Sequence, residues 1–244
     1  MDRAYYIAEL DADVDDVIAA EYLKRRNALA GVVLSPKPKT SLGWDRCSSL
    51  KKMGIDVFTK IPDDAKYVFV GGALTSVAEH IANGHSIECL VMNGGFVGSN
   101  IVPQEFQLDK FRNKLAVRTF NFNIDIDATV AVLKAPENSI KRIVLVGKNV
   151  CHSERNTEKD LWNDKNSLAL FRKYHVRDGK RQHDMLACHE GLALLGLGGV
   201  DDTFCEYQDV YPFNQGLEGS MTRWGSGLEK TEYRKVYAAT SLPE

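Results

Sequence analysis

The sequence predicts an α/β fold, with an open, mainly parallel, twisted sheet that carries helices on both faces. Short apolar runs alternate with stretches of helical length, which is the pattern of successive βαβ units. The 244 residues, 44% hydrophobic and 26% charged, suffice to bury a core without a structural metal or disulfides. No repeat, low-complexity segment or linker interrupts the pattern, so residues 1–244 are predicted to form one domain.

The first half of the chain contains three predicted strands and two predicted helices. The apolar run at 5–10 predicts the first strand, and Asp15 and Asp16 open the helix expected at 14–26, because carboxylates favour a helix N-terminus. Two further apolar runs predict strands, and a threonine suited to capping opens the next helix. These three elements are expected at residues 31–34, 67–70 and 75–82.

The second half of the chain continues the alternation. Apolar runs predict three more strands, and amphipathic stretches predict three more helices, the last of which opens with a His-Asp pair. The strands are expected at 88–92, 142–146 and 233–239. The helices are expected at 127–133, 165–174 and 183–195.

Charge and composition exclude several classes of partner. The formal net charge of −2 gives no basic surface for nucleic acid. The start MDRAYYIAEL lacks the features of a signal peptide, and no stretch approaches eighteen apolar residues, so we expect no membrane association and a cytoplasmic location. The five cysteines form no CxxC pair, which predicts reduced thiols without a disulfide framework or a structural zinc site.

The functional site is expected beyond the carboxyl ends of the strands, where loops enter the following helices. Four segments occupy such places: ELDADVDD (9–16), VGGALTS (70–76), VMNGGFVGSN (91–100) and QHDMLACHEG (182–191). The polar, aromatic-poor stretch 151–167 is expected to be an exposed loop or lid.

The acidic segment 9–16 holds five carboxylates in eight positions, a concentration of charge that a cation would stabilise. An EF-hand loop is disfavoured, because Asp16 and Tyr22 stand where it needs glycine and glutamate. A phosphatase of the haloacid dehalogenase type would use Asp11 as nucleophile and Asp13 as acid/base with Mg²⁺, but its downstream residues are not cleanly spaced. In the third interpretation, Asp11, Asp15 and Asp16 surround one hard cation such as Ca²⁺.

Segment 9–16 resembles DxDPGxDD, the N-terminal signature of the inosine-uridine-preferring nucleoside hydrolases. Glu9 stands at the first acidic position, while Ala12 and Asp13 replace the family's Pro-Gly. Further segments resemble the same family in the same order from residue 5 to about residue 226. They are VGGALTSVAEHI (70–81), VMNGGFVGSNIVP (91–103), TFNFNIDIDATVAVL (119–133), IVLVGKNVCHS (143–153), RQHDMLACHEGL (181–192) and, weakly, GSMTRWGS (219–226).

The resemblance identifies the chain as a distant, shortened member of that family and implies a nucleoside hydrolase-like, Rossmann-like fold. It also implies a Ca²⁺ ion held by Asp11, Asp16, the backbone carbonyl of Thr75 and Asp184. The cation would bind the 2′- and 3′-hydroxyls of a ribonucleoside and the attacking water. Asp11 would act as general base and His183 would protonate the leaving base, with His152 and His189 as alternatives.

The resemblance assigns the remaining site residues to the sugar. Ribose contacts would come from Asp15, Asn100, Asn121, Asn123 and Asp184, and Asn121 stands where a glutamate is common. Residues 104–118 are extra length relative to the family and could reshape the side of the pocket that binds the base. The partner is therefore expected to be a small-molecule nucleoside, and the assembly a homodimer or homotetramer.

Two other functions stay open at this stage. The same fold and metal site could act on, or only bind, another ribosyl compound such as a modified nucleoside or a nucleotide derivative. Asn121, Asp13 and the 104–118 insertion motivate this second hypothesis. The haloacid dehalogenase-type phosphatase is the third.

Overall fold

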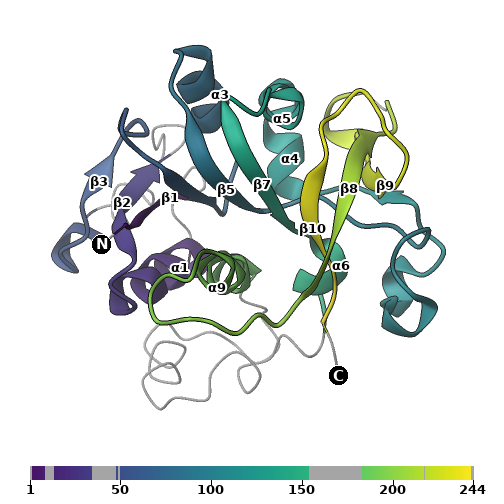
Figure 1. Cartoon of the computed structure of the whole chain (residues 1–244), viewed down its shortest axis with the longest axis horizontal. Helices are drawn as coiled ribbons and strands as arrows, with labels where there is room; N and C mark the ends of the chain where they lie inside the picture. The colour runs from purple at the N-terminus through teal and green to yellow at the C-terminus, as the bar shows by residue number, and fades with distance from the viewer. Residues whose placement is uncertain are drawn as a thin grey trace.

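A ten-stranded sheet runs through the computed structural model, which describes residues 2–8, 14–34, 48, 50–153, 183–216 and 218–242 (Figure 1). The strand order is β3-β2-β1-β4-β5-β7-β10-β8-β9-β6. The strands are β1 (Ala4–Ala8), β2 (Leu29–Leu34), β3 (Val57–Phe58), β4 (Tyr67–Val70), β5 (Ile87–Asn93), β6 (Ala116–Val117), β7 (Ile140–Val146), β8 (Glu206–Asn214), β9 (Trp224–Gly227) and β10 (Val236–Ser241).

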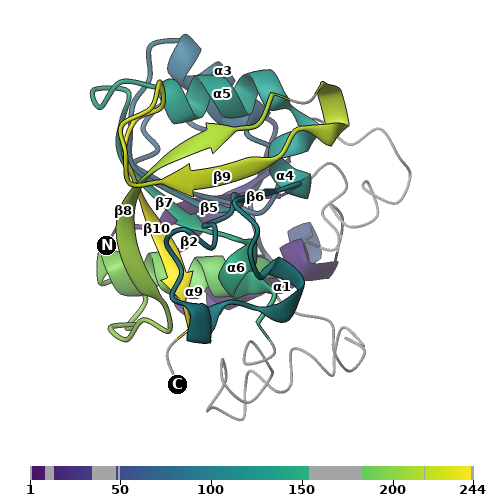
Figure 2. The ribbon, with the colours of Figure 1, turned by 90° about the vertical axis from the view of Figure 1, so that its right-hand side faces the viewer.

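Most of the sheet is parallel. Every neighbouring pair from β3 to β10 in the sheet order is parallel, whereas β8, β9 and β6 add antiparallel pairs at one end. Figure 2 shows β8 and β9 at this end of the sheet, with β6 beside them. The predicted fold class is confirmed, since the sheet is large, mostly parallel and covered by helices.

Helices cover both faces of the sheet. Helices α1 (Val14–Arg25) and α9 (His183–Leu195) pack side by side on one face, and α3 (Thr75–Ala82) and α5 (Ile126–Lys134) cover the other (Figure 1). Two short helices, α4 (Phe120–Ile124) and α6 (Lys148–Cys151), lie in the loops after β6 and β7. Three 3₁₀ turns complete the described elements: η1 (Gln104–Phe106), η2 (Asp109–Phe111) and η3 (Gly219–Met221).

The alternation of side chains along each strand divides the core in two. On β1, Tyr6 belongs to the cluster under α1 and α9, while Ile7 belongs to the cluster under α3 and α5. On β5, Val91 and Leu90 divide in the same way. Burial on both faces explains why these strands are apolar throughout.

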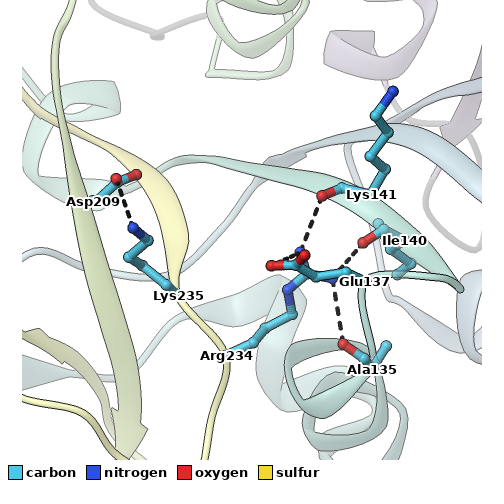
Figure 3. Close-up of polar contacts among 7 residues, drawn as sticks. All are labelled: Ala135, Glu137, Ile140, Lys141, Asp209, Arg234 and Lys235. Atoms are coloured by element: carbon cyan, nitrogen blue, oxygen red, sulfur yellow. Dashed lines mark hydrogen bonds and ion pairs between the residues drawn. The ribbon is translucent and has the colours of Figure 1, made fainter.

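One predicted strand was wrong in position. Residues 233–235 precede the last strand, because Arg234 donates hydrogen bonds to the carbonyls of Ala135, Ile140 and Lys141 (Figure 3). These contacts tie the segment to the end of α5 and the start of β7. Strand β10 therefore begins at Val236 rather than at residue 233. The antiparallel strands β8, β9 and β6 and the short parallel strand β3 were not predicted at all.

Other expectations have mixed outcomes. The helix expected at 165–174 and most of the loop at 151–167 lie outside the described residues. Cys89, Cys151, Cys188 and Cys205 are buried and free. Within the described residues, no helix is long and apolar enough to cross a membrane.

Candidate active site

Two buried aspartates meet where the helices of one face begin. Asp16 lies in the first turn of α1 and is 2% exposed, and Asp184 lies in the first turn of α9 and is 4% exposed. Asp16 accepts a hydrogen bond of 2.8 Å from the hydroxyl of Tyr6. Burial raises the pKa of Tyr6 well above its ordinary value, and the charges of Asp16 and Asp184 raise it further. Both carboxylates therefore act on one phenol.

Gly71 leaves room for this arrangement. It follows β4, and its N–H donates to the carbonyl of Ile7 on the neighbouring strand. A Cβ atom at this position would clash with the Tyr6 hydroxyl and would lie 2.8 Å from Oδ2 of Asp184. The absence of a side chain thus lets the backbone of the β4–α3 loop approach the two acidic residues closely.

Asn93 orients the second aspartate. It is the last residue of β5, and its Nδ2 donates to Oδ1 of Asp184 at 2.6 Å. The thiol of Cys151 lies 3.5 Å from Oδ1 of Asn93, and burial raises the pKa of that thiol, so it stays protonated as a donor. The same thiol lies 3.4 Å from the carbonyl of Val146, and the NH₂ end of the Asn93 amide faces Asp184 because an ionised carboxylate can only accept.

Asn121 joins the two loops that surround Asp184. Its Nδ2 donates to the carbonyl oxygens of Gly71 at 2.7 Å and of Asn93 at 2.8 Å. Helix α4, which carries Asn121, is thereby held across the carboxyl ends of β4 and β5. The structure therefore connects Asn121 to Asp184 through Asn93, and its role toward a sugar stays a prediction.

The other two asparagines make different contacts. Asn100 donates to the carbonyl of Ser226 at 3.1 Å. Asn123 donates to two carbonyls of the 220–222 segment and accepts a hydrogen bond of 2.6 Å from the indole of Trp224. In the described contacts, both side chains tie the β5 and α4 regions to the segment around β9 and do not touch the aspartates. A contact with ribose would require the Asn123 amide to exchange these partners.

Thr75 and Asp15 occupy helix starts, as predicted. Thr75 is the first residue of α3, and its hydroxyl donates to Oδ2 of Asp125 at 2.7 Å. A contribution to a cation would accordingly come from its carbonyl oxygen, as the resemblance implies. Asp15 lies half-buried in the first turn of α1. Glu9, Asp11 and Asp13 lie outside the described residues.

The three candidate leaving-group acids, His183, His152 and His189, lie in two different surroundings. His183 opens α9 and its ring lies 4.6 Å from that of His152, whose Nδ1 is 2.7 Å from the amine of Lys110. The 104–118 insertion therefore reaches the candidate leaving-group acids. His189 instead contacts the hydroxyl of Tyr22 and the carbonyl of Asp202, and burial lowers its pKa to about 4. These contacts give His189 a structural role.

The chemistry of the donors suits a hard divalent cation. Carboxylate and carbonyl oxygens are the ligands that Ca²⁺ takes, and two buried carboxylates that act on one phenol favour a compensating positive charge. Among the described residues, no group of three or more His, Cys, Asp or Glu side chains is arranged to hold a metal. Of the four predicted ligands, Asp16 and Asp184 are the acidic side chains that the structure describes. Asp11 lies outside the described residues, and Thr75 would contribute its backbone carbonyl.

Three residues of this arrangement were missed by sequence reasoning. Tyr6 stands within an apolar strand and is indistinguishable there from a core residue. Cys151 is a buried small side chain without a motif. Asn93 gave a usable signal, since it is a polar residue at the end of an otherwise apolar strand, within the segment 91–100 already selected.

No protein-family model matches the chain. An alignment of 128 residues gives 29% identity to an uncharacterized protein of Aquifex aeolicus (strain VF5), and it spans 49% of the chain and 43% of that protein. The chain thus matches less than half the length of this curated relative.

Two solved structures are similar over nearly the whole chain. The plant nucleoside hydrolase PpNRh1 superposes with a TM-score of 0.60 at 14% identity, covering 99% of this chain and 95% of that one. The inosine-guanosine nucleoside hydrolase IG-NH superposes with a TM-score of 0.54 at 14% identity, covering 98% and 94%. The chain has the mixed α/β fold that these nucleoside hydrolases share.

Proposed function

We propose that this protein hydrolyses the N-glycosidic bond of ribonucleosides, releasing the base and ribose, with a bound Ca²⁺ ion. The observation that carries the proposal is the meeting of buried Asp16 and Asp184 at the starts of α1 and α9. Carboxylates at these positions are what the resemblance of the sequence to nucleoside hydrolases requires. The likeness of the whole fold to solved nucleoside hydrolases supports the same reaction.

The cation would be held by Asp11, Asp16, the carbonyl of Thr75 and Asp184. A divalent ion in such a site supplies a positive charge that polarises water and orients the sugar hydroxyls. Tyr6 and Asn93 hold Asp16 and Asp184 in place by hydrogen bonds of 2.8 and 2.6 Å. Side chains fixed in this way limit the movement of the carboxylates, which favours one orientation of the bound ribose.

The chain's own residues would move the protons. Asp11 would take a proton from the attacking water, and His183 would give one to the departing base. Asp15, Asn100, Asn121 and Asn123 are the proposed contacts to the sugar hydroxyls. Contacts to hydroxyl groups favour ribose over deoxyribose, because buried polar groups lose their partner when a hydroxyl is missing.

A panel assay tests the proposal. The protein is incubated with purine and pyrimidine ribonucleosides, their 2′-deoxy analogues and a generic phosphate ester, and reducing sugar and phosphate are measured. We expect ribose release that disappears in Asp11→Asn and Asp16→Asn. Phosphate release without sugar release would instead indicate the dehalogenase-type phosphatase, and no turnover of any ribonucleoside would refute the proposed activity.

A further inference from the structure

The loop between β4 and α3, residues 71–74, is tied at both of its ends to one neighbouring segment. At the start of the loop, the carbonyl of Gly71 accepts a hydrogen bond of 2.7 Å from Nδ2 of Asn121. At its end, the hydroxyl of Thr75 donates to Oδ2 of Asp125 at 2.7 Å. Asn121 lies on α4, and Asp125 is the residue between α4 and α5. This buried loop is therefore held in place by α4 and the start of α5.

Each oxygen of the Asp125 carboxylate has a partner of its own. Oδ1 accepts a hydrogen bond of 3.0 Å from the N–H of Ala128, so Asp125 is the N-cap of α5. Oδ2 accepts the hydrogen bond from the Thr75 hydroxyl. Hydrogen bonds to a carboxylate are stronger than those between neutral groups. Because the two contacts use different oxygens, a shorter capping residue can keep the first and lose the second.

The turn that carries Asp125 is itself well fixed. The fully buried hydroxyl of Thr129 lies 3.0 Å from the carbonyl of Phe122 and 2.9 Å from that of Asp125. The N–H of Thr129 also donates to the carbonyl of Asp125 at 3.0 Å. Phe122 is 1% exposed, and its ring lies edge-on to that of Trp224 at 5.3 Å. Asp125 is thus mounted on a packed, hydrogen-bonded support, which a residue needs if it is to hold a partner in one orientation.

The 71–74 loop borders Asp184. A Cβ atom on Gly71 would lie 2.8 Å from Oδ2 of Asp184. Asn121, which holds Gly71, also donates to the carbonyl of Asn93, whose side chain donates to Asp184. Thr75 stands at the other end of the same loop. The contacts of α4 and Asp125 therefore hold Thr75 and Asp184, two of the proposed cation ligands, within one connected framework.

We propose that Asp125 is a positioning residue of the cation site, which holds the backbone of Thr75 through the Thr75 hydroxyl. The inference rests on the proposed function, because that function makes the Thr75 carbonyl a ligand of Ca²⁺. Removing a partner that orients a metal ligand typically weakens metal binding by about tenfold or more. The side chain of Thr75 would then be needed for its hydrogen bond, although the backbone carbonyl is what binds the cation.

Titration of Ca²⁺ by calorimetry tests the inference without requiring turnover. Thr75→Val keeps the shape of the side chain but lacks the hydroxyl, and Asp125→Ser keeps a capping residue that is too short to reach Thr75. Each change should raise the dissociation constant of Ca²⁺ by about tenfold or more. The double variant should raise it no further, since both changes remove the same hydrogen bond. Thr75→Ser, which keeps the hydroxyl, should recover most of the affinity lost in Thr75→Val.

The matched control is Asp127→Ser, which makes the same exchange at an exposed position in the first turn of α5 and should leave Ca²⁺ binding unchanged. Effects that add in the double variant would show that Thr75 and Asp125 act separately and would overturn the inference. Equal losses in Thr75→Val and Thr75→Ser would overturn it too, and this comparison decides the matter if Asp125→Ser does not fold.

Two further outcomes separate this inference from the proposed function. Ca²⁺ binding that responds to these variants as expected, in a protein that cleaves no ribonucleoside, would support the role of Asp125 and refute the proposed hydrolysis. Ribonucleoside hydrolysis by a protein that binds no Ca²⁺ would refute the cation site and the role of Asp125 with it, but not the reaction.

Discussion

Helix α9 carries two buried carboxylates that are stabilised in different ways. Glu190 is fully buried, and its oxygens accept hydrogen bonds from the N–H of Phe204 at 2.6 Å and the hydroxyl of Tyr207 at 3.0 Å. Asp184, nearer the start of the helix, shares its surroundings with Asp16, and both charges act on Tyr6 and Cys188. Asp184 and Asp16 also accept side-chain hydrogen bonds, from Asn93 and Tyr6. What sets these two aspartates apart from Glu190 is that both carboxylates act on the same phenol, a concentration of negative charge that a cation would stabilise.

The largest expected effect tests this contrast through activity. Asp184→Asn keeps the shape of the side chain but removes a proposed cation ligand, so ribose release should fall about a thousandfold. Glu190→Gln should retain activity within a few-fold at pH 6, because Glu190 contacts the 204–207 segment rather than the proposed site. Steady-state kinetics measures both, with Asp209→Asn on exposed β8 as the matched control. Equal losses in the Asp184 and Glu190 variants would erase the distinction.

The second effect is on the free energy of unfolding and comes from Glu190, the carboxylate farther along α9. Burial raises the pKa of Glu190 from 4.5 to about 7, so the folded protein keeps the proton at pH values where the unfolded chain has released it. The resulting stabilisation is complete below pH 4.5 and is lost as the pH rises through about 7, a difference of roughly 3 kcal/mol. Glu190→Gln cannot ionise and should remove this decline.

Urea denaturation at several pH values measures that change, with the exposed Glu88→Gln as control. His189 contributes in the opposite direction, since burial lowers its pKa from 6.5 to about 4 and its stabilisation is lost as the pH falls through that range. In Glu190→Gln, the free energy of unfolding should consequently rise between pH 4 and 6.5. A decline above pH 6.5 that persists in this variant would contradict the assignment to Glu190.

The third effect concerns the cation that we propose to bind at Asp184, in the first turn of α9. Ca²⁺ at about a hundred times its dissociation constant should stabilise the protein by ~2.7 kcal/mol, and EDTA should reverse the rise in melting temperature. Asp184→Asn should lose this response, whereas Glu190→Gln should keep it. A melting temperature that changes with neither Ca²⁺ nor EDTA would refute the proposed metal site.

The smallest effect concerns the support of the aspartates. Tyr6→Phe removes the hydroxyl that donates to buried Asp16, and it should lower kcat about tenfold and the free energy of unfolding by about 1 kcal/mol. Tyr5→Phe is the matched control, because Tyr5 lies next to it on β1 and packs on Phe58 at the opposite face. If both variants behave alike, the Tyr6 hydroxyl has no role in positioning Asp16.

The two aspartates were predictable from sequence, and their supports were not. Carboxylates at helix starts after apolar strands follow from local pattern, so Asp16 and Asp184 could be selected. The hydroxyl of Tyr6 acquires its role only when β1 lies beside α1, a contact between residues whose spacing gives no local signal. The need for glycine at position 71 likewise depends on Asp184, far along the chain.

The parallel part of the fold was also easier to predict than its antiparallel end. The parallel strands are buried on both faces, so each is a short apolar run. Strand β8 includes exposed Glu206, Gln208 and Asp209 and pairs with β10, a contact that neither segment signals alone. The start of β10 was misplaced because Arg234 and Lys235 make side-chain contacts with distant segments, including the ion pair of Lys235 with Asp209 (Figure 3).

The two outermost strands of the described sheet have a further consequence for association between molecules. β3 and β6 each contain two residues, Val57–Phe58 and Ala116–Val117. An edge this short offers few free backbone groups to a strand of another molecule, so it resists growth of the sheet from chain to chain. Oligomers of this protein are accordingly expected to form through helices and loops rather than by extending the sheet. The 104–118 insertion, which supplies β6, would then also protect the protein against aggregation.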